Sequence, residues 1–251
     1  MEDIRHADLV RDQLARPPFG TYRREDAPWP VRVGIAGSGE QLLVLTWSAE
    51  ALAHERQLGV QLLRRLGVES GVRVANTLPG ALATPGSLLL GDVIEELGAL
   101  DVPLGETDGA PAARAAWDLV DRVEPEVLVV DEATSGTLLA ARPPGARPWW
   151  RGIVWLRRGG QRPDVPDFAG WQREWLAVPE VTSFAAGSCA ANRFHPSAGV
   201  DAVVTGGVLV LTSFGADARP FRYASDLRVR AESACPCGMR GLAFTLREGR
   251  T

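Results

Sequence analysis

The chain has 251 residues, of which 45% are hydrophobic, and its 27 basic and 31 acidic side chains give a formal net charge of −4. This length and composition predict a sizeable core, as one large domain or a domain with a small appendage, and disfavour a disordered chain. The balanced charge, without a basic run, disfavours a nucleic-acid partner. The lack of a leader and of any run of about 18 apolar residues predicts a cytoplasmic protein with no membrane partner.

Short apolar runs alternate with longer amphipathic ones from residue 31 to about residue 181. Strands are predicted at 31–36, 42–46, 72–76, 99–104, 127–130 and 153–156, and helices at 49–66, 85–97, 110–123 and 168–176. Strands separated by helices of this length pair in parallel through right-handed crossovers. The pattern therefore predicts an α/β fold with a layered, mostly parallel sheet flanked by helices.

The pattern changes after residue 183, where short apolar runs are separated by turns such as Thr205-Gly206-Gly207. Strands are predicted at 200–205, 208–212, 221–223, 227–231 and 242–246. We therefore expect two domains, an α/β core over 1–183 and a small β-rich lobe over 184–251. A proline-rich stretch at 142–148 is the clearest linker inside the first domain.

All three cysteines lie in the last quarter of the chain, close to one histidine in sequence. The set is Cys189, His195, Cys235 and Cys237, which can fill the four tetrahedral positions of a zinc ion and leave no position for substrate. The pattern predicts a structural zinc site that staples the β-rich lobe. The alternative is three unrelated thiols and a surface imidazole. An odd number of cysteines disfavours a disulfide framework.

Every basic residue is an arginine, and the sequence contains no lysine. Arginine replaces lysine readily on exposed surfaces, but not where a titratable amine is needed. No lysine-dependent mechanism is therefore available within this polypeptide.

Several short motifs follow one another in a fixed order. Ala-Asp-Leu-Val-Arg at 7–11 precedes Pro-Phe-Gly at 18–20, a Gly/Ser-rich loop follows at 33–39, and later motifs lie at 67–74 and 97–105. In this order they resemble the adenylate-forming acyl-CoA ligases, specifically the phenylacetate–coenzyme A ligase branch. The family has "KEDLR…PFG", a phosphate loop, "GVxPGDRV" and "LGATVIPxG" at the corresponding places.

The resemblance is strongest in the β-rich lobe. Residues 207–213 are similar to the family's "GELVLTT", residues 220–227 to "PLIRYRTGDL", and residues 235–238 to "CPCG". The resemblance implies the ligase fold and a zinc ion on the Cys3His set. It also implies a nucleotide site with Asp226 on the ribose hydroxyls and Arg222 and Tyr223 beside it, although a strand-end aspartate also suits a cap or turn.

The sequence departs from the family where ATP chemistry is carried out. The phosphate loop becomes Ala-Gly-Ser-Gly-Glu at 36–40, without the family's lysine and with Glu40 where phosphates would sit. The segment whose glutamate holds Mg²⁺ in the family is expected at 182–188, which contains no acid. The "GRT" at 249–251 resembles the hinge before the family's C-terminal domain, so that domain and its catalytic lysine are expected to be missing.

The other polar and aromatic candidates have plain interpretations. His54 is expected on a solvated helix face and His6 in a frayed terminus, while residues 159–161 are expected to form a strand-to-helix turn. The tryptophans at 149, 150, 155, 171 and 175 are expected to fill a core, with an aromatic substrate pocket as the alternative.

These observations favour a degenerate ligase-like protein without ATP-dependent adenylation. It would act as a binding or accessory module for an acyl or aromatic acid, an acyl-CoA, or a partner such as a full-length ligase or carrier protein. Zinc is then the expected cofactor, whereas ATP, AMP and CoA are not. The alternative is an enzyme, either one acting on an already activated acid or a reduced ligase that takes the lysine domain from a partner chain. A homodimer is possible, as in related ligases.

Overall fold

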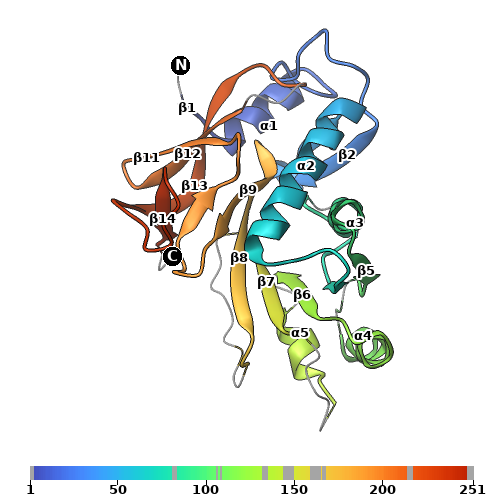
Figure 1. The fold of residues 1–251 in the computed structure, drawn as a ribbon. Helices are drawn as coiled ribbons and strands as arrows, with labels where there is room; N and C mark the ends of the chain where they lie inside the picture. The colour runs from blue at the N-terminus through green and yellow to red at the C-terminus, as the bar shows by residue number, and fades with distance from the viewer. Residues whose placement is uncertain are drawn as a thin grey trace.

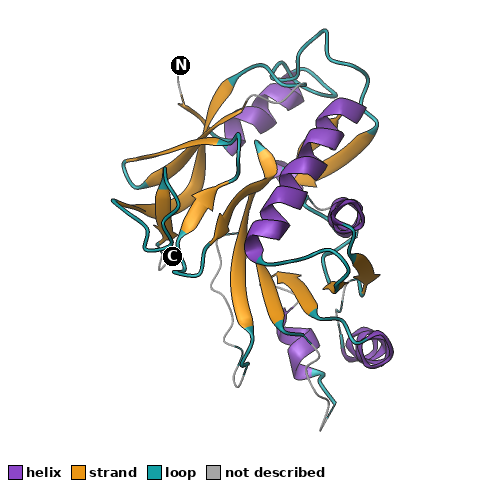
Figure 2. Ribbon diagram, viewed as in Figure 1, coloured by secondary structure: helices purple, strands orange, loops and turns teal. Residues whose placement is uncertain are grey.

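The structure, a computed structural model, describes residues 3–80, 84–105, 107, 109–131, 135–143, 150–158, 165, 168–213 and 217–247. Figure 1 shows its helices and strands in chain order, and Figure 2 their types. The helices are α1 (His6–Ala15), α2 (Ala49–Leu66), α3 (Ser87–Leu97), α4 (Ala110–Val123) and α5 (Ser135–Ala140). The fold is a mixed α/β fold built on one large sheet.

One half of the large sheet is parallel. Its strands are β4 (Arg73–Asn76), β5 (Leu100–Pro103), β6 (Val127–Asp131), β7 (Gly152–Arg157) and β8 (Trp171–Val178). They lie in the order β5-β4-β6-β7-β8, and each neighbouring pair is parallel. The parallel pairing predicted for the α/β region is confirmed for these five strands. It is wrong for the strands predicted at 31–36 and 42–46, because β2 (Arg32–Ala36) and β3 (Leu43–Trp47) pair antiparallel with each other in a separate two-stranded sheet.

The other half of the sheet is largely antiparallel and continues directly from β8. Its strands are β9 (Thr182–Ser188), β10 (Phe194–Pro196), β11 (Asp201–Thr205), β12 (Val208–Ser213), β13 (Phe221–Glu232) and β14 (Ala243–Leu246). The order continues β8-β9-β10-β14-β13-β12-β11, while the short β1 (Asp3–Ile4) pairs in parallel with β13. The two runs predicted at 221–223 and 227–231 form the single strand β13. The predicted domain boundary after residue 183 falls inside β9.

Helices cover both faces of the parallel strands, because alternate residues of each strand point to opposite sides. Val127 and Val129 of β6 pack in a cluster with α2 and α3, whereas Leu128 and Val130 pack in a cluster with α4 and α5. A third cluster joins α1 to the antiparallel strands. The α/β part therefore has three layers, as Figure 1 shows.

The bounds of α2 follow from its terminal residues. The Ser48 side chain accepts a hydrogen bond from the Ala51 backbone N–H at the N-terminus. Gly67 ends the helix with φ 95°, a left-handed conformation that suits glycine. The prediction of a helix over 49–66 is confirmed to the residue.

The helix predicted at 168–176 is wrong, because this segment contains the strand β8. Trp171–Val178 pairs with β7 on one side and with β9 on the other. Trp171 and Trp175 both pack in the cluster below α2 and α3. A spacing of four residues puts two side chains on the same face of a helix or of a strand, so it does not separate the two.

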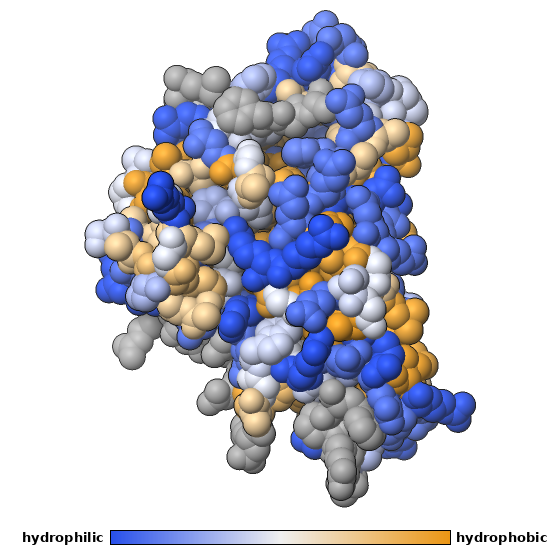
Figure 3. Space-filling model, viewed as in Figure 1, coloured by the Kyte–Doolittle hydropathy of each residue, from blue (hydrophilic) through white to orange (hydrophobic). Residues whose placement is uncertain are grey.

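The surface carries a few large apolar side chains among its polar ones. Leu88 of α3 and Leu100 of β5 are exposed, and Figure 3 shows hydrophobic surface on the side of the molecule where β5 lies. Within the described residues, no helix is long and apolar enough to span a membrane.

Candidate functional site

The four predicted metal ligands meet where β10 pairs with β14, within the antiparallel half of the sheet. Cys189 follows β9, His195 lies in β10, and Cys235 and Cys237 lie in the loop between β13 and β14. Their ligand atoms all lie within 4.8 Å of one another. Two segments that are far apart in sequence, 189–195 and 235–237, are therefore brought into one cluster, which can hold a metal ion.

Two of the separations between these atoms match those of a tetrahedral metal site. The Sγ atoms of Cys189 and Cys235 are 3.5 Å apart, and Cys237 Sγ is 3.4 Å from His195 Nε2. Zinc bonds of about 2.0–2.3 Å to nitrogen and sulfur give ligand separations of about 3.3–3.8 Å in a tetrahedron. Three thiols and an imidazole are also the donors that zinc prefers, so the residues present fit the ion.

The protonation chemistry of the cluster favours a cation. Burial raises the pKa of Cys189, but hydrogen bonds from the Arg193 and Ala191 backbone outweigh it, and the pKa is lowered overall. Burial and the neighbouring thiols raise the pKa of Cys235 to about 11. Three adjacent thiolates repel one another unless a bound cation compensates them. Burial, with the charge of Arg65, lowers the pKa of His195 and keeps its ring in the neutral form that ligates metals.

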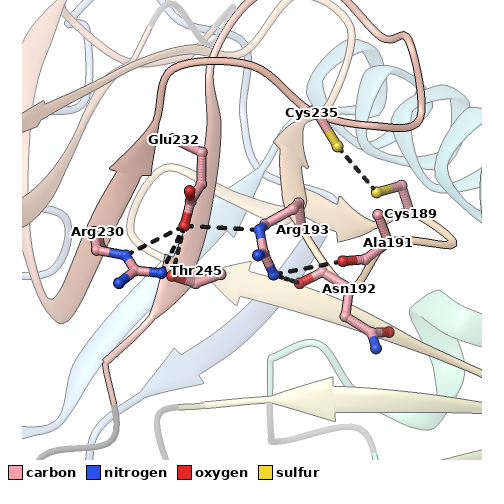
Figure 4. Close-up of polar contacts among 8 residues, drawn as sticks. All are labelled: Cys189, Ala191, Asn192, Arg193, Arg230, Glu232, Cys235 and Thr245. Atoms are coloured by element: carbon pink, nitrogen blue, oxygen red, sulfur yellow. Dashed lines mark hydrogen bonds and ion pairs between the residues drawn. The ribbon is translucent and has the colours of Figure 1, made fainter.

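An ion-pair network fixes the loop that carries Cys189. Arg193 lies 3.7 Å from the Glu232 carboxylate, which also pairs with Arg230 at 3.1 Å. The Arg193 guanidinium also donates to the carbonyls of Ala191 and Asn192. Figure 4 shows this network beside the Cys189–Cys235 contact. The loop is thus tied to β13, the strand that leads into the loop with Cys235 and Cys237.

A cavity of about 330 Å³ lies at the carboxyl ends of β7 and β8, where open α/β sheets bind ligands. We call it the cavity at the sheet edge, meaning the edge formed by the ends of these strands. Its polar lining includes Arg158, Glu180, Tyr223 and Asp226, and Gly37 of the Gly/Ser-rich loop forms part of the wall. Arg158 donates to the carbonyls of Thr84 and Pro85, at 3.0 and 3.2 Å. The cavity therefore contains two carboxylates and a guanidinium already bonded to the backbone.

Glu180 is held by a histidine from the start of the chain. The Nδ1 atom of His6 lies 2.7 Å from the Glu180 carboxylate, and its Nε2 atom lies 2.7 Å from the Gln41 carbonyl. Both partners are acceptors, so both bonds form only when the ring carries two protons. Burial lowers the pKa of His6, but Gln41 and Glu180 raise it more, and the net shift is upward.

Sequence reasoning was wrong about His6. The residue is the first of α1 and does not belong to a frayed terminus. The contact could not be predicted because its partner lies near the end of β8, far away in sequence.

The comparison with known proteins finds solved structures that are similar to this one. No protein-family model and no curated protein matches this sequence. A 2-hydroxyisobutyryl-CoA ligase, in the postadenylation state with an acyl-AMP, has TM-score 0.81 at 17% identity, covering 97% of this chain and 56% of that one. The chain has the fold of adenylate-forming acyl-CoA ligases.

Two further solved structures share this ligase fold. The O-succinylbenzoate coenzyme A synthetase of Bacillus subtilis, in complex with AMP, has TM-score 0.59 at 11% identity, covering 91% of this chain and 50% of that one. VinN, in complex with L-aspartate, has TM-score 0.55 at 10% identity, covering 85% of this chain and 58% of that one. The chain spans little more than half the length of these proteins.

The structure brings together only part of the nucleotide site predicted from the ligase resemblance. Tyr223 and Asp226 line the cavity at the sheet edge. Arg222 does not line it, because its side chain forms an ion pair with Asp3 of β1 at 2.9 Å. Neighbouring residues of a strand point to opposite faces, which separates Arg222 from Tyr223.

Glu180 is the acid that sequence reasoning missed. The segment at 182–188 contains no acid and forms β9, but Glu180 lies two residues earlier and lines the cavity. Its position just beyond the end of β8 is a signal that could have identified it, since ligand-binding residues of α/β sheets follow strand ends.

A second cavity of about 200 Å³ lies beside α1, β3 (Leu43–Trp47) and α2, and shares Pro179 and Glu180 with the first. Its lining includes exposed His54 and buried Glu55. The Glu55 carboxylate accepts the Ser183 backbone N–H at 2.9 Å, and burial raises the pKa of Glu55. Sequence reasoning placed His54 on a solvated face, which is confirmed.

The tryptophans at 150, 155 and 175 are buried in hydrophobic clusters on the two faces of the sheet, and Trp171 packs against one cluster while half-buried. The core interpretation is confirmed for these four residues. Trp149 and the turn at 159–161 lie outside the described residues, as does most of the proline-rich stretch at 142–148.

Proposed function

We propose that this chain is a ligase-fold protein that does not adenylate its ligand and serves as a binding or accessory module. Its ligand would be a small carboxylic or aromatic acid or the corresponding acyl-CoA, or its partner a full-length ligase or carrier protein. The observation that carries the proposal is the charge of the cavity at the sheet edge. Among the described residues that line it, Glu180 and Asp226 are the carboxylates, Glu180 is already paired with His6, and the guanidinium of Arg158 is bonded to two carbonyls.

Adenylation needs cations where charge develops on the departing pyrophosphate, and loss of one stabilising group costs about 100- to 1,000-fold in rate. The chain has no lysine to supply such a charge. The loop beside the cavity carries Glu40 in an exposed 3-10 turn, Gly39–Gln41. A triphosphate in the cavity would meet the carboxylates of Glu180 and Asp226, which supports the loss of the reaction.

We also propose that zinc occupies the Cys3His cluster and has a structural role. The four donors leave no coordination position for substrate. The ion would join the loop after β9 to the loop between β13 and β14, and its chemistry there would be limited to holding these segments together.

A second candidate function is an active enzyme. It is favoured by the presence of Glu180 and Asp226 in one cavity, because a carboxylate at this place can hold Mg²⁺. Such an enzyme would take a lysine-bearing domain from a partner chain, or transfer or condense an acyl group that is already activated.

The two candidates are separated by ATP–pyrophosphate exchange with Mg²⁺ and a panel of aromatic and short-chain acids, with the protein alone and with a full-length ligase added. We expect no exchange, together with an increase in melting temperature on adding an aromatic acid or an acyl-CoA. Replacing Asp226 with alanine should abolish that increase. The matched control is Asp118→Ala on the exposed face of α4. Exchange that depends on Asp226 would overturn the proposal and support the enzyme.

A further inference from the structure

One arginine of α2 is bonded to the strand that carries the histidine of the metal cluster. The Arg65 guanidinium donates to the His195 carbonyl at 2.9 Å and to the Pro196 carbonyl at 2.8 Å. The planar guanidinium fork makes two such bonds at once, which a lysine ammonium does not reproduce. The backbone at His195 is therefore held from the helix layer as well as by strand pairing.

A glycine in the sheet leaves room for this side chain. Gly187 of β9 pairs with His195 of β10. A methyl group at Gly187 would lie 2.5 Å from Leu62 Cδ1 and 3.1 Å from Arg65 Nη2. Glycine thus allows α2 to lie close enough to the sheet for Arg65 to reach β10.

The charge of Arg65 needs an explanation, because the side chain is half-buried and no carboxylate pairs with it among the described residues. Burial lowers the pKa of Arg65, and the negative charge of the Cys189 thiolate raises it. Three thiolates and a neutral imidazole around a divalent cation carry one net negative charge. A buried cation beside such a centre compensates that charge.

We infer that Arg65 is a positioning and charge-balancing residue of the metal centre. It fixes the peptide that orients His195 toward Cys237, and it supplies the positive charge that a centre with three thiolates requires. This inference rests on the proposed occupation of the Cys3His cluster by a divalent metal, and it does not depend on the ligand of the cavity at the sheet edge.

The two roles make different demands on the side chain. Arg65→Lys keeps the charge and loses the fork, whereas Arg65→Met loses both while keeping much of the apolar stem. Arg64→Met, one position earlier and exposed, is the matched control. Residues that support metal ligands in this way typically contribute about 10- to 100-fold to metal affinity.

The test is metal affinity in the purified full chain. Zinc is titrated against a chromophoric chelator, and Co²⁺ is added to the metal-free protein to record the thiolate-to-cobalt absorption. We expect Arg65→Met to lower zinc affinity by about 10- to 100-fold and to alter the Co²⁺ spectrum, with Arg65→Lys in between and Arg64→Met unchanged. A merely structural role would lower stability equally with and without metal and leave the spectrum as it is.

The outcomes separate the inference from its premise. A wild-type protein that binds neither zinc nor Co²⁺ tightly overturns the metal centre and this inference with it. A metal-binding wild type with Arg65→Met indistinguishable from Arg64→Met overturns the role of Arg65 alone. If Arg65→Met does not fold, Arg65→Lys decides: affinity and spectrum equal to those of the wild type overturn the positioning role, and lowered affinity supports it.

Discussion

Replacing His6 with alanine tests whether an imidazolium links α1 to the cavity at the sheet edge. The His6 and Glu180 side chains are only 17% and 10% exposed, so solvent screens their interaction weakly. A hydrogen bond to a charged group contributes about 1.5–3 kcal/mol, and we expect His6→Ala to lower the free energy of unfolding by about 2 kcal/mol at about pH 6. For a protein of this size, the melting temperature would fall by about 2–4 °C per kcal/mol.

The effect of His6→Ala should depend on pH in one direction. The folded-state pKa of His6 is raised above 6.5, so the folded protein binds the proton more tightly than the unfolded chain does. The stabilisation is therefore complete below the unfolded-state pKa and is lost as pH rises through the folded-state pKa.

The assay is urea unfolding from about pH 5.5 to about pH 9 for the wild type, His6→Ala and His54→Ala. His54, which is exposed, serves as the control. A stability difference between wild type and His6→Ala that stays constant across this range would refute the doubly bonded imidazolium. A His6 resonance that titrates below the ordinary histidine pKa would refute it as well.

Three further predictions concern the metal, the core and a helix cap. Removing the metal with a chelator, or replacing Cys235 and Cys237 with serine, should take metal content from about one equivalent to none and speed amide hydrogen exchange in β13 and β14 more than in β6 and β7. Trp175→Ala should lower the free energy of unfolding in urea by about 3–5 kcal/mol, because the ring is fully buried and stacks on Phe184 with the ring centroids 4.9 Å apart. Trp29→Ala, at a position that is 80% exposed, should lower it far less. Ser48→Ala should cost about 1 kcal/mol by the same measurement, since it removes the N-cap of α2.

Local chemistry explains which parts of the fold could be predicted from the sequence. The helix 49–66 has its own start and stop residues, Ser48 and Gly67, and the helix 110–123 has a proline in its first turn. Both helices have the predicted bounds. The segment containing β8 has no such residues, and its pairing with strands on both sides decides its conformation. Tertiary pairing of this kind outweighs local propensity.

The metal cluster and the cavity at the sheet edge also differ in how far the sequence could predict them. The metal cluster could be predicted because cysteine and histidine carry the chemistry in their side chains, and all three cysteines belong to it. The cavity at the sheet edge depends on what each charge is paired with. Glu180 is bonded to His6, and Arg222 is turned away toward Asp3. Those partners come from the first residues of the chain, and no sequence pattern connects them.

The position of the metal cluster explains why its removal should affect the antiparallel strands most. Among the neighbouring pairs of the large sheet, β10 and β14 share a single pair of facing residues, Phe194 and Phe244, whose rings stack at 5.6 Å. The parallel strands β6 and β7 share five such pairs. One ladder position is a weak connection between β10 and β14 within the antiparallel half of the sheet, and the four metal ligands lie on both sides of it. A bound ion would therefore hold together the junction with the fewest backbone contacts, while β6 and β7 stay closed through their own pairing and the helices on both faces.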